Sequence, residues 1–271
     1  MDDRPIGMFD SGFGGLTVAR AVIDLLPTEH VVYLGDTARY PYGSRTQEEV
    51  RQFSLQIATH LIESYDIKLL VVACNTATAA ALESLRQELA VPVIGVIEPG
   101  VRALALATET GRVGVIGTVG TIESGAYQQA VVEWAPEVEL ASSACPGFVE
   151  FVERGAMSGH EVTLLASRLL APISACGIDA LLLGCTHYPY LARVISDVIG
   201  RGVVLVSSAD ETAFALARML AVAGIGNGSN EPGSHRFISS GNVDAFVALG
   251  NRLLGPELVD AETWNPARLS A

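Results

Sequence analysis

Two segments of this chain repeat one pattern, in which a short apolar strand ends on a cysteine and a threonine follows shortly after. The apolar run over residues 69–73 ends at Cys74, and the run over residues 181–184 ends at Cys185. An apolar run of this length before helix-forming sequence is typical of a buried parallel strand followed by a helix. Open α/β sheets place their sites at the carboxyl ends of such strands. The repetition predicts that the two thiols face each other in one site.

Strands and helices alternate along the whole chain, which predicts an α/β fold with parallel sheets. A strand, a glycine-containing turn and a helix begin at Ile6, and a similar unit begins at Val113. These starts lie nearly as far apart as the two cysteines, which indicates an internal duplication. We expect two pseudo-symmetric, doubly wound, flavodoxin-like lobes with the active site in the cleft between them.

The pattern of elements also predicts where the lobes begin and end. It restarts at Glu98-Pro99-Gly100 after the strand expected over residues 93–97. We therefore expect the first lobe to comprise residues 1–97 together with a return segment, 208–271, and the second lobe to comprise residues 98–207. A chain that crosses twice between similar lobes leaves a cleft between them.

Three local features are also predicted from sequence signals. Ser44 with Gln47 has the spacing of a capping box for a helix over residues 45–64. A single helix is expected over residues 122–134. The tail after Pro256 has no periodicity and predicts no regular element.

Composition limits the classes of partner. The chain has 271 residues, 49% of them hydrophobic, and a formal net charge of −13. An acidic chain without a basic cluster is a poor candidate for binding nucleic acid or an anionic membrane surface. No stretch is long enough for a transmembrane helix, and the N-terminus lacks the pattern of a signal peptide, so we expect a cytoplasmic protein. In that reducing compartment the other two cysteines, Cys145 and Cys176, are expected to be inert core thiols.

A glycine-rich turn, Asp10-Ser11-Gly12-Phe13-Gly14-Gly15, follows the first expected strand. Glycines let a ligand approach the backbone, and a helix start offers free N–H groups to an anion. The turn matches neither the Rossmann fingerprint nor the P-loop. It is consistent with an anion site or with a plain tight turn.

Several kinds of thiol chemistry fit the pair less well. Zinc needs three or four close ligands and a redox disulfide favours Cys-x-x-Cys, which the sequence lacks. A single nucleophilic Cys185 assisted by His187 would leave Cys74 unexplained. Pyridoxal phosphate needs a Schiff-base lysine, and the only lysine, Lys68, immediately precedes a buried strand. Two opposed thiols without metal or cofactor suggest removal of a proton from one face of a carbon and its return to the other.

Four motifs together resemble those of bacterial glutamate racemases. They lie at residues 9–15, 40–43 (Tyr-Pro-Tyr-Gly), 73–77 (Ala-Cys-Asn-Thr-Ala) and 184–189 (Gly-Cys-Thr-His-Tyr-Pro). Their order and spacing match, and the resemblance covers nearly the whole chain. It implies cofactor-independent interconversion of L- and D-glutamate by 1,1-proton transfer, which supplies D-glutamate for peptidoglycan in the cell wall. It also implies a homodimer.

The same resemblance implies roles for five side chains. Cys74 matches the thiol that acts on D-glutamate, and Cys185 matches the thiol that acts on L-glutamate. Asp10 matches the acid that assists the first thiol, and His187 matches the histidine that assists the second. Glu153 matches a further auxiliary carboxylate.

The residues that match substrate contacts of the family are Asp10, Ser11, Tyr42, Gly43, Asn75, Thr76, Thr118, Thr121, Thr186 and His187. Apart from Arg39, which directly precedes Tyr40, no arginine belongs to these motifs. Backbone N–H groups and hydroxyls at helix starts are therefore expected to bind the two carboxylates of glutamate.

The protonation of the thiols depends on two opposing effects. A helix N-terminus favours the thiolate, and this effect is expected at both cysteines. A carboxylate at Asp10 would favour the thiol of Cys74, so Asp10 is expected to act as a proton acceptor or relay. His187 as an imidazolium would favour the thiolate of Cys185.

Two other functions fit part of the pattern. One is a racemase of the same superfamily that acts on aspartate or a hydantoin; the complete set of motifs favours glutamate. The other is a two-lobed protein that binds a dicarboxylate without turning it over. Paired thiols are not needed for binding alone, which argues against the second alternative.

Overall fold

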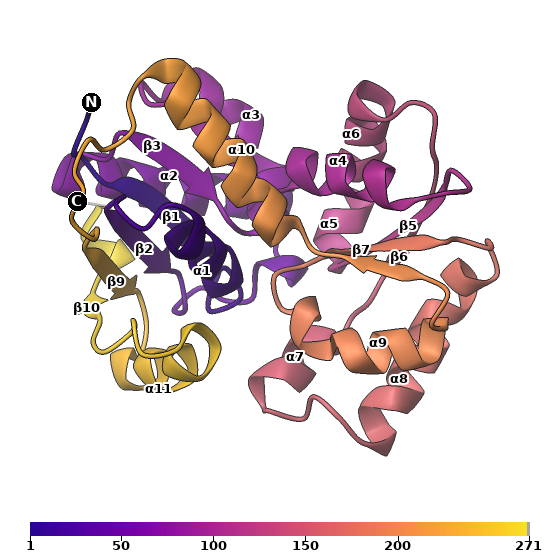
Figure 1. The fold of residues 1–271 in the computed structure, drawn as a ribbon. Helices are drawn as coiled ribbons and strands as arrows, with labels where there is room; N and C mark the ends of the chain where they lie inside the picture. The colour runs from indigo at the N-terminus through magenta and orange to yellow at the C-terminus, as the bar shows by residue number, and fades with distance from the viewer. Residues whose placement is uncertain (270–271) are drawn as a thin grey trace.

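The computed structural model describes residues 1–269 and contains two parallel sheets (Figure 1). The first sheet consists of β1 (Ile6–Asp10), β2 (Val31–Gly35), β3 (Leu69–Val72), β4 (Val93–Gly95), β9 (His235–Ser239) and β10 (Glu262–Thr263). The second consists of β5 (Arg112–Gly117), β6 (Glu139–Ala144), β7 (Ala180–Gly184) and β8 (Val204–Val206). The predicted α/β fold with two parallel sheets is confirmed.

The two sheets share one topology. Four strands of the first sheet run in the order β2-β1-β3-β4, and the strands of the second run β6-β5-β7-β8. Each is the order 2-1-3-4 of a flavodoxin-like sheet, with its switch point between the first and third strands. β9 and β10 extend the first sheet beyond β2. The exact lobe boundaries near residues 97 and 207 stay predictions.

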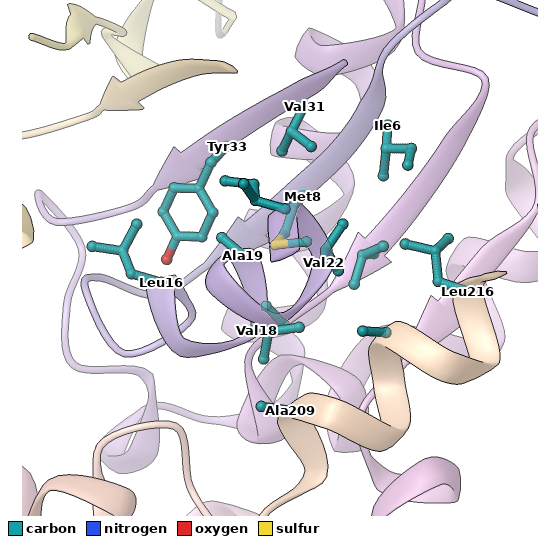
Figure 2. Packing of buried hydrophobic residues seen from close by; sticks show 14 of the residues in the cluster. Ile6, Met8, Leu16, Val18, Ala19, Val22, Val31, Tyr33, Ala209 and Leu216 are labelled. Atoms are coloured by element: carbon teal, nitrogen blue, oxygen red, sulfur yellow. The ribbon is translucent and has the colours of Figure 1, made fainter. Parts of the chain in front are cut away.

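Helices cover both faces of the first sheet. The helices are α1 (Leu16–Leu25), α10 (Ser208–Ala223) and α11 (Val243–Leu254) on one face, and α2 (Gln47–Tyr65) and α3 (Asn75–Glu88) on the other. Side chains alternate along a strand, so Ile6 and Met8 point to the first face and Phe9 to the second. Figure 2 shows the core under α1, where Val22 of the helix packs with Met8 and Tyr33 of the strands.

The second sheet is covered in the same way. The helices are α4 (Ile97–Ala107) and α6 (Ala126–Trp134) on one face, and α7 (Phe148–Glu153), α8 (His160–Ser174) and α9 (Ala192–Ile199) on the other. Short elements lie between them: α5 (Val119–Glu123) and the 3-10 turns η1 (Tyr42–Ser44), η2 (Tyr188–Leu191) and η3 (Pro266–Leu269). Within residues 1–269 no helix is both long and apolar enough to cross a membrane.

The predicted start of α2 is wrong by two residues. Ser44 belongs to η1, and the capping box is formed by Thr46 and Glu49, each of which accepts a hydrogen bond from the other's backbone N–H. An N-cap must directly precede the first helical residue. Because the 3-10 turn occupies residues 42–44, the first helical residue of α2 is Gln47.

Three other expectations also differ from the structure. The helix expected over 122–134 is divided into α5 and α6, because Gly125 adopts a left-handed conformation (φ 72°). The break expected at Glu98-Pro99-Gly100 is the first turn of α4, where a proline without an N–H is tolerated. The tail contains β10, a two-residue strand that pairs with β9.

A buried ion pair joins three parts of the first lobe at the amino ends of its strands. The Nζ atom of Lys68 lies 2.6 Å from Oε2 of Glu29 and donates to the carbonyl of Asp2 at 2.7 Å. The other carboxylate oxygen of Glu29 accepts from the backbone N–H of Asn227 at 2.7 Å. The Lys68 side chain is fully buried. The pair therefore ties the return segment to the N-terminal part of the first lobe.

We predict that Lys68→Met lowers the free energy of unfolding by about 3–5 kcal/mol, because it leaves the Glu29 carboxylate buried and unpaired. Urea denaturation measures the loss. In the double variant Lys68→Met/Glu29→Gln no charge remains, and the introduced amide keeps an acceptor for Asn227, so most of the stability should return. A single variant as stable as wild type would contradict this account of the pair.

Candidate active site

A cavity of about 110 Å³ lies where strand ends of both sheets meet. Its walls come from the segments that follow β1, β2, β3, β5, β6 and β7. Ten predicted site residues line it: Ser11, Tyr42, Gly43, Cys74, Asn75, Thr76, Thr118, Cys185, Thr186 and His187. The volume is small beside the roughly 300–1,000 Å³ of pockets for drug-sized ligands, so the cavity suits a molecule the size of an amino acid.

Cys74 lies at the start of α3, as the sequence predicted. Its sulfur accepts a hydrogen bond from the N–H of Ala77 at 3.4 Å, and its carbonyl accepts from Thr78 at 2.8 Å. Its sulfur also lies 3.7 Å from Oγ of Ser11, in the turn after β1.

The helix expected directly after Cys185 is wrong. A 3-10 turn occupies residues 188–191, and α9 begins only at Ala192. The reason is Pro189. An α-helix that began at Cys185 would need a hydrogen bond from the N–H of residue 189 to the Cys185 carbonyl, and proline has no N–H to donate. Tyr188 donates to that carbonyl instead, at 3.0 Å. Cys74 therefore caps a helix, whereas Cys185 does not.

Both thiols are protonated at neutral pH in this structure. Burial, followed by the nearby Asp10 carboxylate, raises the pKa of Cys74 to about 12. Burial also raises the pKa of Cys185 well above that of an ordinary thiol. The hydrogen bond from Ala77 acts to lower the pKa of Cys74, as expected of a helix start, but desolvation outweighs it.

Asp10 joins the two lobes behind the cavity. Its carboxylate accepts from the N–H of Gly12 at 2.8 Å and from the hydroxyl of Thr186 at 3.2 Å. The side chain is fully buried, and this burial raises the pKa of Asp10. It is a carboxyl group that takes up a proton more readily than an exposed aspartate does.

His187 stands between the second thiol and Glu153. Its Nδ1 atom lies 4.0 Å from the sulfur of Cys185, and its Nε2 atom lies 3.4 Å from Oε1 of Glu153 at the end of α7. His187 is buried, whereas the Glu153 side chain is 26% exposed. The three groups form a row from the cavity toward the surface.

On the side of α3 and α5, hydroxyl and amide groups form hydrogen bonds between the two lobes. Thr76 of α3 meets Thr118 and Thr121 at the start of α5, with the three oxygens 2.9–3.1 Å apart. The amide of Asn75 donates to the Tyr127 hydroxyl at 2.8 Å. Thr121, like Asp10 and Glu153, lies behind the lining residues and does not border the cavity.

No lysine or arginine among residues 1–269 borders the cavity. Arg39 donates to Asp36 at 2.7 Å, and Asp36 also accepts from the hydroxyls of Tyr42 and Ser240. Arg39 therefore supports the loop that carries Tyr42 and is not available to a ligand. Carboxylates in the cavity would meet hydroxyls and backbone N–H groups.

The sequence analysis missed several lining residues, among them Tyr40, Cys145, Glu150 and Tyr188. Cys145 directly follows β6, so it lies at the carboxyl end of a strand, which the sequence analysis did not recognise. The expectation of a core thiol is wrong for Cys176, which is exposed. In the described part of the chain, no three His, Cys, Asp or Glu side chains group as a metal site.

A family model described as Asp/Glu/Hydantoin racemase matches residues 16–216, which is most of the chain. The chain belongs to the Asp/Glu/Hydantoin racemase family. It is 50% identical over 257 residues to the glutamate racemase of Geobacter metallireducens, with 95% of each chain covered.

Solved structures of the same family have the same fold. A glutamate racemase isoform from Bacillus anthracis is 42% identical, with 98% of each chain covered and a TM-score of 0.91. The glutamate racemase of Francisella tularensis, solved in complex with D-glutamate, is 34% identical, with a TM-score of 0.91 and coverage of 99% of this chain and 100% of that one. The similarity to family members thus extends over both lobes.

A first prediction concerns Gly14, whose Cα faces the second lobe. A methyl group there would lie 2.2 Å from Oγ1 of Thr186 and 2.6 Å from Nδ1 of His187. We predict that Gly14→Ala displaces these side chains and lowers kcat for the racemisation proposed below at least roughly 100-fold, with little change in Tm, since a misplacement of about 1 Å costs about that much. Gly202→Ala is the matched control, because a methyl group at Gly202 meets no atom within 4 Å. Equal activity of the two variants would contradict the contact.

A second prediction concerns Asp10 and pH. Because folding raises the pKa of Asp10, the folded state holds its proton more tightly than the unfolded state, whose pKa is about 3.9. The stability contributed by the protonated group is complete below that value and is lost as the pH rises through the folded pKa. Asp10→Asn should therefore be more stable than wild type at about pH 7, and the difference should shrink toward about pH 4. Urea unfolding across this range tests the sign; a destabilised variant at neutral pH would contradict it.

Proposed function

We propose that this member of the family interconverts L- and D-glutamate by two-thiol proton transfer without a cofactor. The observation that carries the proposal is that Cys74 and Cys185, which follow equivalent strands of two similarly ordered sheets, border one small cavity. Relatives that are half identical over nearly their whole length are glutamate racemases.

The proposed reaction moves one proton at each face of the α-carbon. From L-glutamate, Cys185 as a thiolate removes the α-proton, and the electron pair of the C–H bond stays on the substrate. The Cys74 thiol then gives its proton to the opposite face, which yields D-glutamate. Cys185 ends as a thiol and Cys74 as a thiolate, and the reverse reaction restores the first state.

The helpers of each thiol differ in this proposal. Asp10 accepts or relays a proton on the Cys74 side, for which its raised pKa suits it. His187, backed by Glu153, takes the proton of Cys185. The substrate contacts proposed are Asp10, Ser11, Tyr42, Gly43, Asn75, Thr76, Thr118, Thr121, Thr186 and His187, of which Asp10 and Thr121 would act from behind the cavity wall.

Thiolate formation must be coupled to substrate binding. Burial raises the pKa of Cys74 far enough that the free protein holds this group as the thiol at neutral pH. The ammonium group of glutamate brings a positive charge into a desolvated cavity, where it favours the thiolate strongly. A neutral resting pair also avoids two buried negative charges.

The alternatives are less well supported. Aspartate and hydantoin racemases share the family description, but the curated relatives at about 50% identity are glutamate racemases. A pure binding protein would not need two thiols at the same cavity. We further propose that the enzyme is a cytoplasmic homodimer that supplies D-glutamate for peptidoglycan, and that neither nucleic acid nor membrane is a partner.

The test is proton exchange at the α-carbon. Wild type, Cys74→Ala and Cys185→Ala are incubated with each enantiomer in D₂O, while NMR follows deuteration and polarimetry follows inversion. Wild type should racemise with exchange, and each variant should lose racemisation at least roughly 1,000-fold, since a thiol at one face cannot serve the other. Cys176→Ala, at an exposed thiol, is the control.

The outcomes separate the competing functions. Full racemisation by either active-site variant would exclude the two-thiol mechanism. Binding of glutamate without deuteration by wild type would indicate a binding protein. Exchange with aspartate in preference to glutamate would change the substrate but keep the mechanism.

A further inference from the structure

Tyr40 reaches from one lobe into the other. It belongs to the loop after β2 in the first lobe, yet its ring packs against the apolar cluster of the second lobe that contains Cys185 and Tyr188. Its other side faces Gly12, where an added methyl group would lie 2.9 Å from its Cδ2 atom. Tyr40 also borders the cavity. It therefore bridges the lobes beside the second thiol.

The neighbours of Tyr40 are the two groups behind that thiol. Its ring lies 6.0 Å from the ring of His187, centroid to centroid, at an angle of 35°. Its hydroxyl lies near the carboxylate of Glu153, and burial together with this carboxylate raises the pKa of Tyr40 far above its ordinary value. The hydroxyl therefore keeps its proton and can act as a hydrogen-bond donor.

Each of these three neighbouring side chains has a polar atom without a well-aligned partner in residues 1–269. These atoms are Oη of Tyr40, Oε1 of Glu153 and Nε2 of His187, and each is buried. Nε2 and Oε1 are 3.4 Å apart, close enough for a short movement to align them. Unpaired buried polar atoms are costly, so a cluster of three that could satisfy one another indicates groups that pair during function.

We propose that Tyr40 is a positioning residue for the Cys185 half of the reaction, an inference that rests on the proposed function. The hydroxyl of Tyr40 donates to Glu153 and holds its carboxylate against Nε2 of His187, while the ring of Tyr40 packs beside the imidazole. With its proton on Nε2, His187 presents the lone pair of Nδ1 to the Cys185 thiol. The thiol proton moves to Nδ1, the sulfur keeps the electron pair, and Glu153 stabilises the imidazolium that forms.

Kinetics of this reaction have one special constraint. The enantiomers of glutamate are equally stable in water, so kcat/KM must be equal in the two directions for every variant. A defect at Cys185 therefore cannot appear as a loss in one direction of kcat/KM. It appears in isotope effects, because it makes proton transfer at Cys185 more rate-limiting than transfer at Cys74.

The experiment compares wild type with Tyr40→Phe, which keeps the ring and loses the hydroxyl. We expect kcat/KM to fall about tenfold, the size of one lost hydrogen bond. The primary isotope effect on kcat/KM should rise with L-[2-²H]glutamate and fall toward unity with D-[2-²H]glutamate. Tyr65→Phe is the matched control, since it removes a hydroxyl that lies 3.0 Å from the surface carboxylate of Glu262.

A double variant tests whether Tyr40 acts through Glu153. If it does, Tyr40→Phe/Glu153→Gln should be no slower than the slower single variant, because the two changes break one interaction. Three outcomes would overturn the role of Tyr40 while leaving the proposed racemase intact. They are a double variant in which the losses of the two single variants multiply, isotope effects that are equal with both enantiomers, and a Tyr40→Phe rate equal to that of wild type. A wild-type protein that does not racemise glutamate would overturn both proposals.

Discussion

Desolvation of two thiols in one small cavity is the constraint on which the proposed chemistry depends. It keeps Cys74 and Cys185 protonated in the free protein, against the helix start that favours the thiolate of Cys74. The same dry surroundings strengthen every charge that enters. A substrate ammonium can then change the protonation of the thiols, and the neighbouring Asp10, itself desolvated, can accept a proton. In the proposed mechanism the thiols thus stay protonated in the free protein and become reactive when the substrate binds.

The two lobes share a strand order, but the surroundings of their thiols differ. Cys74 caps a regular helix and contacts Ser11, whereas Pro189 prevents a helix from starting at Cys185. The 3-10 turn that results places His187 beside Cys185, with Glu153 behind it. One proline therefore accounts for much of the departure from symmetry. Such different helpers are compatible with the proposed mechanism, in which the two thiols act on opposite faces of the α-carbon.

The return segment supports the site from a distance. β9 adds to the first sheet beside β2, and Ser240 just beyond it donates to Asp36, which also holds Arg39 and Tyr42. The loop that borders the cavity is thus fixed by residues about 200 positions later in the chain. Arg39, which directly precedes the Tyr-Pro-Tyr-Gly motif, supports this loop through Asp36. The groups that remain for the proposed recognition of carboxylates are hydroxyls and backbone N–H groups.

Local pattern was sufficient for the strands that end at the two thiols, because apolar runs and chain breakers act over a few residues. It failed at the start of α2 and at Gly125, where a turn and a left-handed residue set the boundary. The approach of Tyr40 to Glu153 lies beyond any local pattern. Contacts across the lobes, and the desolvation that they cause, depend on how the two sheets are packed together. Only the tertiary structure therefore decided which groups face the thiols and whether each thiol keeps its proton.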